Sequence, residues 1–348
     1  MVIFSYSRLV VIAVFLFLAC GVSAQIVDQD ALDSLVRIGE RPDAAKGPTK
    51  VSISLHVLDV FGVDEVKQNY LADLFALAEW HDSRLALPEA ERLGRIRTVD
   101  QATIWTPRVL VLNDRGLDMQ LPTVANVDDL GNVRYQQRLS GMLAAQFEFK
   151  EFPFDSQIVS VDLISYLYSP EEVVFELDAS MTGEADKFSA KGWKFSLLAS
   201  EAALYEVPSV GVQRPMISYR MEAKRISEYH LLTMFLPMAL IVFMAWAAFW
   251  IQPELVPPRI AISTASIFSL IALGFSVRLG LPQVSYLTRA DMFVLGCTLL
   301  VFSALGVAVL GSRWASSERL EKAVRLNAYV RWVYALSFGI VILLALYL

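Results

Sequence analysis

The sequence predicts an all-β, immunoglobulin-like sandwich of about ten strands, followed by an all-α transmembrane domain of four helices. Three observations predict this fold class. Hydrophobic residues make up 55% of the 348 residues and charged residues 19%, which is more apolar than a typical soluble domain. The sequence from Val51 to Arg225 alternates apolar and polar residues, as β-strands do. Four long apolar segments follow it, so we expect the domain boundary between residues 225 and 226.

The N-terminus has the pattern of a secretory signal over residues 1–24. A single Arg8 precedes an apolar core from Leu9 to Ala19, and small residues stand before Gln25. We expect cleavage after Ala24, with an uncleaved membrane anchor as the alternative. Cleavage places residues 25–225 outside the cytoplasm.

Residues 51–225 are expected to form the sandwich. Alternating runs rich in β-branched and aromatic residues recur there, separated by Gly, Pro, Asn and Asp. One such run is V-S-I-S-L-H-V-L, which begins at Val51. Residues 64–80 fit either a strand or a short helix. The chain has two cysteines, Cys20 in the expected signal and Cys297 in an apolar run, so the sandwich is expected to fold without an intrachain disulfide.

Each apolar segment is long enough to cross a hydrocarbon core of about 30 Å. We expect helices at residues 229–251, 260–281, 291–311 and 326–348, with a kink at Pro237. Buried helices of a soluble core are the alternative, which four such segments in succession disfavour. The connection at 311–325 is expected in the cytoplasm because it is basic, with Arg313, Arg319, Lys322 and Arg325.

The acidic excess lies in the first part of the chain. The net charge is −6, yet residues 226–348 hold eight Lys or Arg against five Asp or Glu. An acidic exported domain argues against nucleic acid as a partner. Histidine occurs three times, and no metal-ligand spacing or nucleophile motif stands out. We therefore expect no metal, no cofactor and no catalytic residue, and a membrane enzyme is the least favoured function.

The second apolar segment differs from the others because hydroxyl groups run through it. They belong to Ser263, Thr264, Ser266, Ser269 and Ser276. Polar residues in a spanning helix usually face a bundle interior or water. Helix packing through small residues is the alternative.

With these features the chain resembles the pentameric ligand-gated ion channels, the Cys-loop receptor superfamily, from about Val51 to Leu348. Seven motifs carry the resemblance in order: W-H-D-S-R-L at 80–85, W-T-P at 105–107, F-P-F-D with Gln157 at 152–157, Arg225, Pro237, Pro258-Arg259 and R-L-G-L-P-Q-V-S-Y at 278–286. Arg108 stands where the family has an acid.

The positions of the family's bridging cysteines hold Ala145 and Val159. Bacterial members lack that bridge, and the short 312–325 connection resembles them too. The resemblance therefore implies a homopentamer in lipid at a bacterial inner membrane, with a periplasmic N-terminal domain.

The resemblance implies that the loop after residue 145 couples the sandwich to the membrane domain. Proline stiffens the turn, so its flanking aromatic side chains are expected to dock on the linker at 283–288. Asp155 and Arg225 are expected to pair there, with an ordinary surface ion pair as the alternative. The expected coupling residues are Phe152, Pro153, Phe154, Asp155, Arg225, Pro282 and Tyr286.

The resemblance also implies a small-molecule agonist site between subunits, lined by aromatic residues. Tyr166 and Tyr205 are expected on one side, although Tyr166 also fits core packing. The first loop contributes Asn113 but no aromatic residue, so the aromatic box is incomplete. The complementary strands are expected to present Phe75, Glu79, Tyr135 and Arg138. Aromatic faces beside an acid suit an amine, and protons are the other candidate agonist. Trp80 and Trp105 are expected in the core.

By the same resemblance, the second crossing lines a pore for inorganic ions. Its expected facing residues, spaced by four and three along one helical face, are Ala261, Ala265, Phe268, Ala272, Phe275 and Leu279. Apolar rings gate by dewetting, so Phe268 is the expected main gate and Phe275 the second. A register shift of one residue would expose Thr264 instead.

The charges near the pore mouths bear on selectivity. Pro258 stands where cation channels of the family carry Glu, and Arg259 and Arg278 add positive charge. Glu254 and the acidic outer domain favour cations instead. We expect anion selectivity by a narrow margin. The alternative to a channel is a membrane-anchored periplasmic sensor without conductance, which usually needs a cytoplasmic effector domain.

Overall fold

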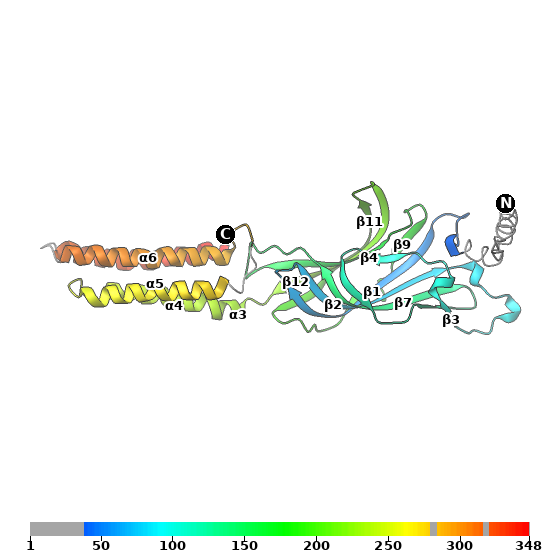
Figure 1. Ribbon diagram of the computed structural model, residues 1–348, viewed down its shortest axis with the longest axis horizontal. Coiled ribbons are helices and arrows are strands. Elements are labelled where there is room, and N and C mark those ends of the chain that lie inside the picture. Colours follow the sequence, from blue (N-terminus) through cyan, green and yellow to red (C-terminus); the bar gives the residue numbers. More distant parts are fainter. Residues whose placement is uncertain (1–37, 279–283, 316–319, 348) are drawn as a thin grey trace, which may run out of the picture.

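The computed structural model describes residues 38–278, 284–315 and 320–347, and of Arg278 only the backbone. The molecule is elongated, with the strands at one end and the helices at the other (Figure 1). The expected signal at 1–24 lies outside the described residues, as do Leu279 and Pro282.

Two sheets form the sandwich, with twelve described strands where about ten were expected. The larger sheet has the order β10-β1-β2-β7-β6-β3, with β5 beside β7 and β9 beside β1, and the smaller has the order β11-β12-β8-β4. The strands are β1 (Thr49–Asp64), β2 (Asn69–His81), β3 (Arg97–Asp100), β4 (Val109–Val111), β5 (Asp114–Met119), β6 (Val124–Val127), β7 (Asn132–Ala144), β8 (Ser156–Ser165), β9 (Val173–Leu177), β10 (Gly183–Glu184), β11 (Trp193–Val207) and β12 (Val212–Arg225).

Alternate side chains of β1 face the core between the two sheets. Val51, Ile53, Leu55 and Val57 are all buried, because every second side chain of a strand points to the same face. The ambiguous stretch at 64–80 is mostly strand: β2 buries Tyr70, and its pattern has the two-residue period of a sheet. The helix alternative for it is wrong.

The two tryptophans expected in the core are buried. The Trp105 indole N–H donates to the Tyr168 hydroxyl at 2.8 Å, and its ring meets Trp80 edge-on at 6.0 Å between centroids. Buried indoles usually find a hydrogen-bond partner, as Trp105 does.

The described helices follow the four apolar segments. The first crossing comprises α3 (Glu228–His230), a π-helical turn (Leu231–Phe235), α4 (Leu236–Ala247) and a 3₁₀ turn (Ala248–Trp250). The others are α5 (Val256–Arg278), α6 (Arg289–Ala315) and α7 (Leu320–Tyr347). All four are long and apolar enough to span a membrane.

The first crossing has a π-helical turn just before Pro237, where the sequence predicts a kink. A proline has no N–H to donate and crowds the preceding turn, and the helix widens there into the π-helical turn.

Two helices begin four or more residues earlier than expected. α5 starts at Val256, because prolines in a first turn lose no hydrogen bond there. α7 starts at Leu320. Charged side chains before residue 326 lower the local hydropathy and so delayed the expected start, but exposed charges do not interrupt a helix.

Candidate functional sites

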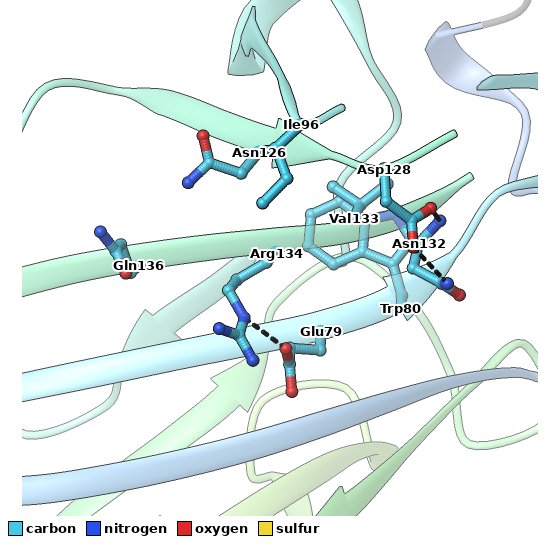
Figure 2. A pocket seen from close by; sticks show the side chains of 9 residues that line it. All are labelled: Glu79, Trp80, Ile96, Asn126, Asp128, Asn132, Val133, Arg134 and Gln136. Atoms are coloured by element: carbon cyan, nitrogen blue, oxygen red, sulfur yellow. Dashed lines mark hydrogen bonds and ion pairs between the residues drawn. The ribbon is translucent and has the colours of Figure 1, made fainter. Parts of the chain in front are cut away.

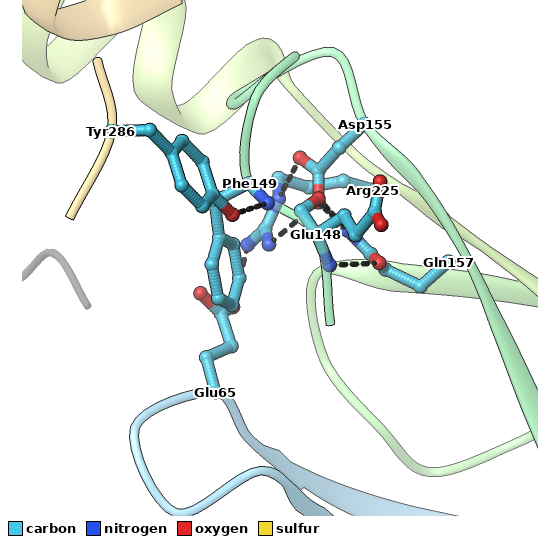
Figure 3. Close-up of polar contacts among 7 residues, drawn as sticks. All are labelled: Glu65, Glu148, Phe149, Asp155, Gln157, Arg225 and Tyr286. Carbon is cyan, nitrogen blue, oxygen red and sulfur yellow. Dashed lines mark hydrogen bonds and ion pairs between the residues drawn. The ribbon is translucent and has the colours of Figure 1, made fainter. Parts of the chain in front are cut away.

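Arg225 at the end of β12 forms a buried double hydrogen bond with Asp155 (Figure 3). The Arg225 Nε lies 2.6 Å from Asp155 Oδ1, and Nη2 lies 3.1 Å from Oδ2. Both side chains are almost fully buried. The surface-pair alternative therefore does not describe this pair, which lies in a low-dielectric position.

Arg225 also holds two other parts of the domain. Its Nη1 donates to Glu65 Oε1 at 2.6 Å, in the turn between β1 and β2. Its guanidinium carbon lies 4.2 Å from the Trp193 ring centroid and 4.8 Å from that of Phe152. Burial alone would lower the pKa of Arg225, but hydrogen bonds to Asp155 and Glu65 outweigh it and raise that pKa.

Gln157 closes the loop that carries Asp155. Its Nε2 donates to Asp155 Oδ2 at 2.6 Å and to the Glu148 carbonyl at 2.7 Å, and its Oε1 accepts from the Glu148 N–H at 2.9 Å. The Gln157 side-chain amide thus both donates to and accepts from the Glu148 backbone, as a neighbouring strand does in a sheet. Its bond to Asp155 holds the Asp155 carboxylate toward Arg225.

The loop caps the first turn of α6. The backbone N–H groups of Arg289 and Ala290 donate to the carbonyls of Lys150 and Phe152, at 3.0 and 3.1 Å. Groups at a helix N-terminus have no intrahelical acceptor, so the loop supplies what the helix lacks. The Tyr286 hydroxyl accepts from the Phe149 N–H at 2.9 Å (Figure 3).

The aromatic side chains of the loop dock elsewhere than expected. The Phe152 ring meets His230 edge-on, with centroids 4.9 Å apart, and the Phe154 ring lies 6.2 Å from that of Phe235. Phe235 in turn stacks on Phe293 of α6. These rings therefore contact the first crossing, while the loop backbone and Tyr286 make the contacts near the linker.

The complementary strands present three of the four expected residues on one face. Phe75 pairs with Arg138 and Glu79 with Arg134 across β2 and β7. Tyr135 pairs with Ala78 instead, and it lines a cavity between the sheets with Gln137. Its expected place at the complementary face is wrong, because neighbouring residues of a strand point to opposite faces.

A polar pocket of about 580 Å³ lies over this face, and sequence reasoning did not find it (Figure 2). Glu79 accepts from Arg134 Nε at 2.5 Å along one wall. Asp128 accepts from the Asn132 N–H and side-chain amide at 2.8 and 2.7 Å. Burial would raise the pKa of Asp128, but these bonds lower it. The full lining is Glu79, Trp80, Ile96, Asn126, Asp128, Asn132, Val133, Arg134 and Gln136.

The other expected half carries Tyr166 and Tyr205. Tyr166 is 49% exposed, so core packing does not describe it. Tyr205 pairs with Arg214 across β11 and β12, and Arg214 Nη1 donates to the Leu167 carbonyl at 2.9 Å, which ties the hairpin to the loop after β8. The β11 end projects from one side of the sandwich, whereas β2 and β7 lie along the other (Figure 1). One subunit therefore cannot bring both halves together.

Asn113 is committed to the backbone rather than to a pocket. Its side-chain amide donates to the carbonyls of Ala144 and Ser160 at 3.0 and 2.7 Å. These bonds tie the turn between β4 and β5 to β7 and β8, so the expected ligand role does not fit this position.

The expected pore-facing residues share an unpartnered face of α5. Phe268 and Phe275 are 67% and 68% exposed within the subunit. Ser263, Ser266 and Leu270 point the other way and are buried. Thr264, which the alternative register would expose, is partly buried. The exposed positions among the described residues include Ala261, Ala265, Phe268, Ala272 and Phe275.

Arg259 does not lie where the sequence placed it. Its side chain is 1% exposed and hydrogen-bonds Asn327 of α7 at 2.8 Å, inside the bundle. It therefore presents no charge to a pore mouth. Glu254 is exposed at the same end, and Arg278 ends the described part of α5.

Comparison with known proteins agrees with this architecture. Residues 29–227 match the neurotransmitter-gated ion-channel ligand binding domain, and residues 234–331 match the neurotransmitter-gated ion-channel transmembrane region. The gamma-aminobutyric acid receptor subunit gamma-3 of Mus musculus is 25% identical over 269 residues, which are 76% of this chain and 58% of that protein. Subunit beta-4 of Gallus gallus is 26% identical over 292 residues, 82% of this chain and 59% of that protein.

This chain therefore spans about three-fifths of the length of the curated relatives it matches. The two matched regions together cover most of the chain and meet close to the boundary between β12 and the first crossing. The chain belongs to the neurotransmitter-gated ion-channel family of the Cys-loop superfamily.

Proposed function

We propose that this chain is the subunit of a homopentameric ligand-gated ion channel of a bacterial inner membrane. A small agonist binds between adjacent sandwiches, the cluster around Arg225 transmits the change, and α5 lines the pore. The expected domain division at residues 225 and 226 is part of the proposal, since β12 ends at Arg225 and α3 begins at Glu228.

The unpartnered face of α5 carries this proposal. Large apolar side chains such as Phe268 and Phe275 stand exposed on a helix whose opposite face is packed against its own bundle. Exposed apolar faces of this kind mark contact with another surface or a pore. In a symmetric ring, the face gives stacked apolar constrictions.

The pocket beside Glu79 favours an agonist that carries both signs of charge. Its wall holds a carboxylate and a guanidinium that now pair with each other, and a zwitterion can engage both. Trp80 lines the same pocket but is only 4% exposed. The relatives are named for gamma-aminobutyric acid, an amine with a carboxylate, and this compound is the natural first probe.

Glu79→Gln is expected to raise the half-maximal agonist concentration about 10-fold or more, because a hydrogen bond to a charged group contributes about 1.5–3 kcal/mol. Concentration–response curves of the full-length channel measure it. The matched control is Glu176→Gln, which removes the carboxylate that pairs with Lys50 in the same sheet but outside the pocket. Equal shifts in both variants would place the agonist elsewhere.

We expect the pore to select anions. This expectation rests on Pro258, which replaces the Glu of cation channels, and on the positive charge of Arg278, because Arg259 is buried and presents no charge to the pore. The reversal potential of reconstituted channels in asymmetric salt measures it. A reversal at the cation equilibrium potential would refute anion selectivity. The absence of current across agonists and pH values would refute the channel itself and favour the non-conducting sensor.

A further inference from the structure

The buried guanidinium of Arg259 lacks acceptors for most of its donors. Among the described residues only Nη2 has a hydrogen-bond partner, Asn327 Oδ1 at 2.8 Å. Nε and Nη1 have no hydrogen-bond partner among the described residues. An arginine stays charged in proteins, and burying a cation with unpaired donors is costly. Something with acceptor character must therefore complete this site.

No carboxylate among the described residues fills that role. None of the ion pairs among the described residues involves Arg259, and Glu254 nearby is exposed. A neighbouring subunit cannot supply the acceptor, because Arg259 is 1% exposed within its own subunit. Asn327 is also committed, since its Nδ2 donates to the Phe249 carbonyl at 2.5 Å.

Two features near the Arg259 guanidinium also favour an anion: an unpaired hydroxyl donor and the positive end of a helix dipole. Ser263 lies one turn along α5 on the same face, is fully buried, and its hydroxyl has no partner among the described residues. Side chains on a helix tilt toward its N-terminus, so the Ser263 hydroxyl lies over the turn that holds Arg259. Arg259 is in the first turn of α5, at the positive end of the helix dipole, which further disfavours an uncompensated cation.

The guanidinium is closely surrounded by neighbouring helices. A Cβ added at Gly311 of α6 would lie 3.4 Å from Arg259 Nη1, so this backbone closes one side. Asn327 of α7 closes another. A compact ion fits between three helices better than a phosphate or carboxylate that carries a substituent.

We propose that Arg259, with Ser263 beside it, binds a monatomic anion, chloride, at the cytoplasmic end of the helix bundle and behind the pore face of α5. The ion neutralises the guanidinium and accepts from its free donors. The site is distinct from the permeation path, because Ala261 and Ala265 on the opposite face are exposed while Arg259 and Ser263 are buried.

Thermal unfolding of the full-length protein in detergent tests this site without requiring conduction. At constant ionic strength, Tm is expected to rise with the logarithm of chloride concentration when chloride replaces gluconate, because a ligand that binds only the folded state stabilises it. Arg259→Met, which removes charge and donors at similar volume, is expected to lose this dependence. Lys322→Met removes an exposed charge at the same membrane side and is expected to keep it.

Crystals grown in bromide give the second readout, which applies to the unmodified protein even if Arg259→Met fails to assemble. An anomalous peak beside the Arg259 guanidinium is expected. A peak confined to the pore axis, water alone beside Arg259, or a Tm that is the same in chloride and gluconate would overturn the proposal. None of these results depends on whether the pore selects anions.

Discussion

Phe268→Ala is expected to produce a channel that conducts at rest. The Phe268 side chain lies near the middle of α5 and is exposed on the proposed pore face, and a ring of such side chains excludes water from a narrow pore. If the free energy that favours the closed state falls by about 1.4 kcal/mol, the small conducting fraction rises tenfold. Because every subunit loses its ring member, we expect the resting current to rise by roughly tenfold or more.

The matched control is Phe302→Ala. Phe302 is also an exposed phenylalanine, but it lies on α6, away from the proposed pore face. Its truncation is expected to leave the resting current low. Agonist-free current, normalised to the maximal agonist response and to surface expression, measures both variants. A tight resting pore in Phe268→Ala would rule out this residue as the main gate.

Asp155→Ala is expected to uncouple agonist binding from opening. It leaves Arg225 buried with only Glu65 as a charged partner, and removal of one member of a buried pair costs about 3–5 kcal/mol. If the pair is part of the coupling, this free-energy cost differs between the closed and open states and so shifts the equilibrium between them. Coupling free energies between sites are typically 1–3 kcal/mol, so we expect the half-maximal agonist concentration to rise about 5–150-fold, or the current to disappear.

Glu201→Ala is the comparison variant for Asp155. Glu201 pairs with Arg220, which lies on the same strand as Arg225, but this pair is exposed. Exposed pairs contribute about 0–1 kcal/mol, so this variant is expected to respond as the unmodified channel does. Agonist binding measured separately from current distinguishes lost coupling from lost affinity. Normal currents in Asp155→Ala would show that the pair has no part in opening.

The features that sequence reasoning found are those with a strong local signal. The helices were found because apolar runs of that length have few other interpretations. The facing residues of α5 were assigned through the family resemblance, and their spacing of three and four residues keeps them on one helical face. Asp155 and Arg225 are 70 positions apart, and their pairing was predicted only through the family resemblance.

The features it missed depend on register or on distant packing. The face of Tyr135 depends on how β7 pairs with β2, and one residue of register reverses it. Arg259 was placed at a pore mouth through the family resemblance. Its burial depends on Asn327 and Gly311, which are 68 and 52 positions away in the sequence. The contacts of Phe152 with His230 likewise join separate domains.

The amide of Gln157 holds its loop closed by hydrogen bonds alone, across nine positions from Glu148. Closing such a loop costs chain entropy, which a covalent bridge removes from the unfolded state but which hydrogen bonds must offset in the folded one. Loop closure here is therefore reversible and independent of the redox state of the compartment. A thiol reductant is therefore expected to leave its gating unchanged.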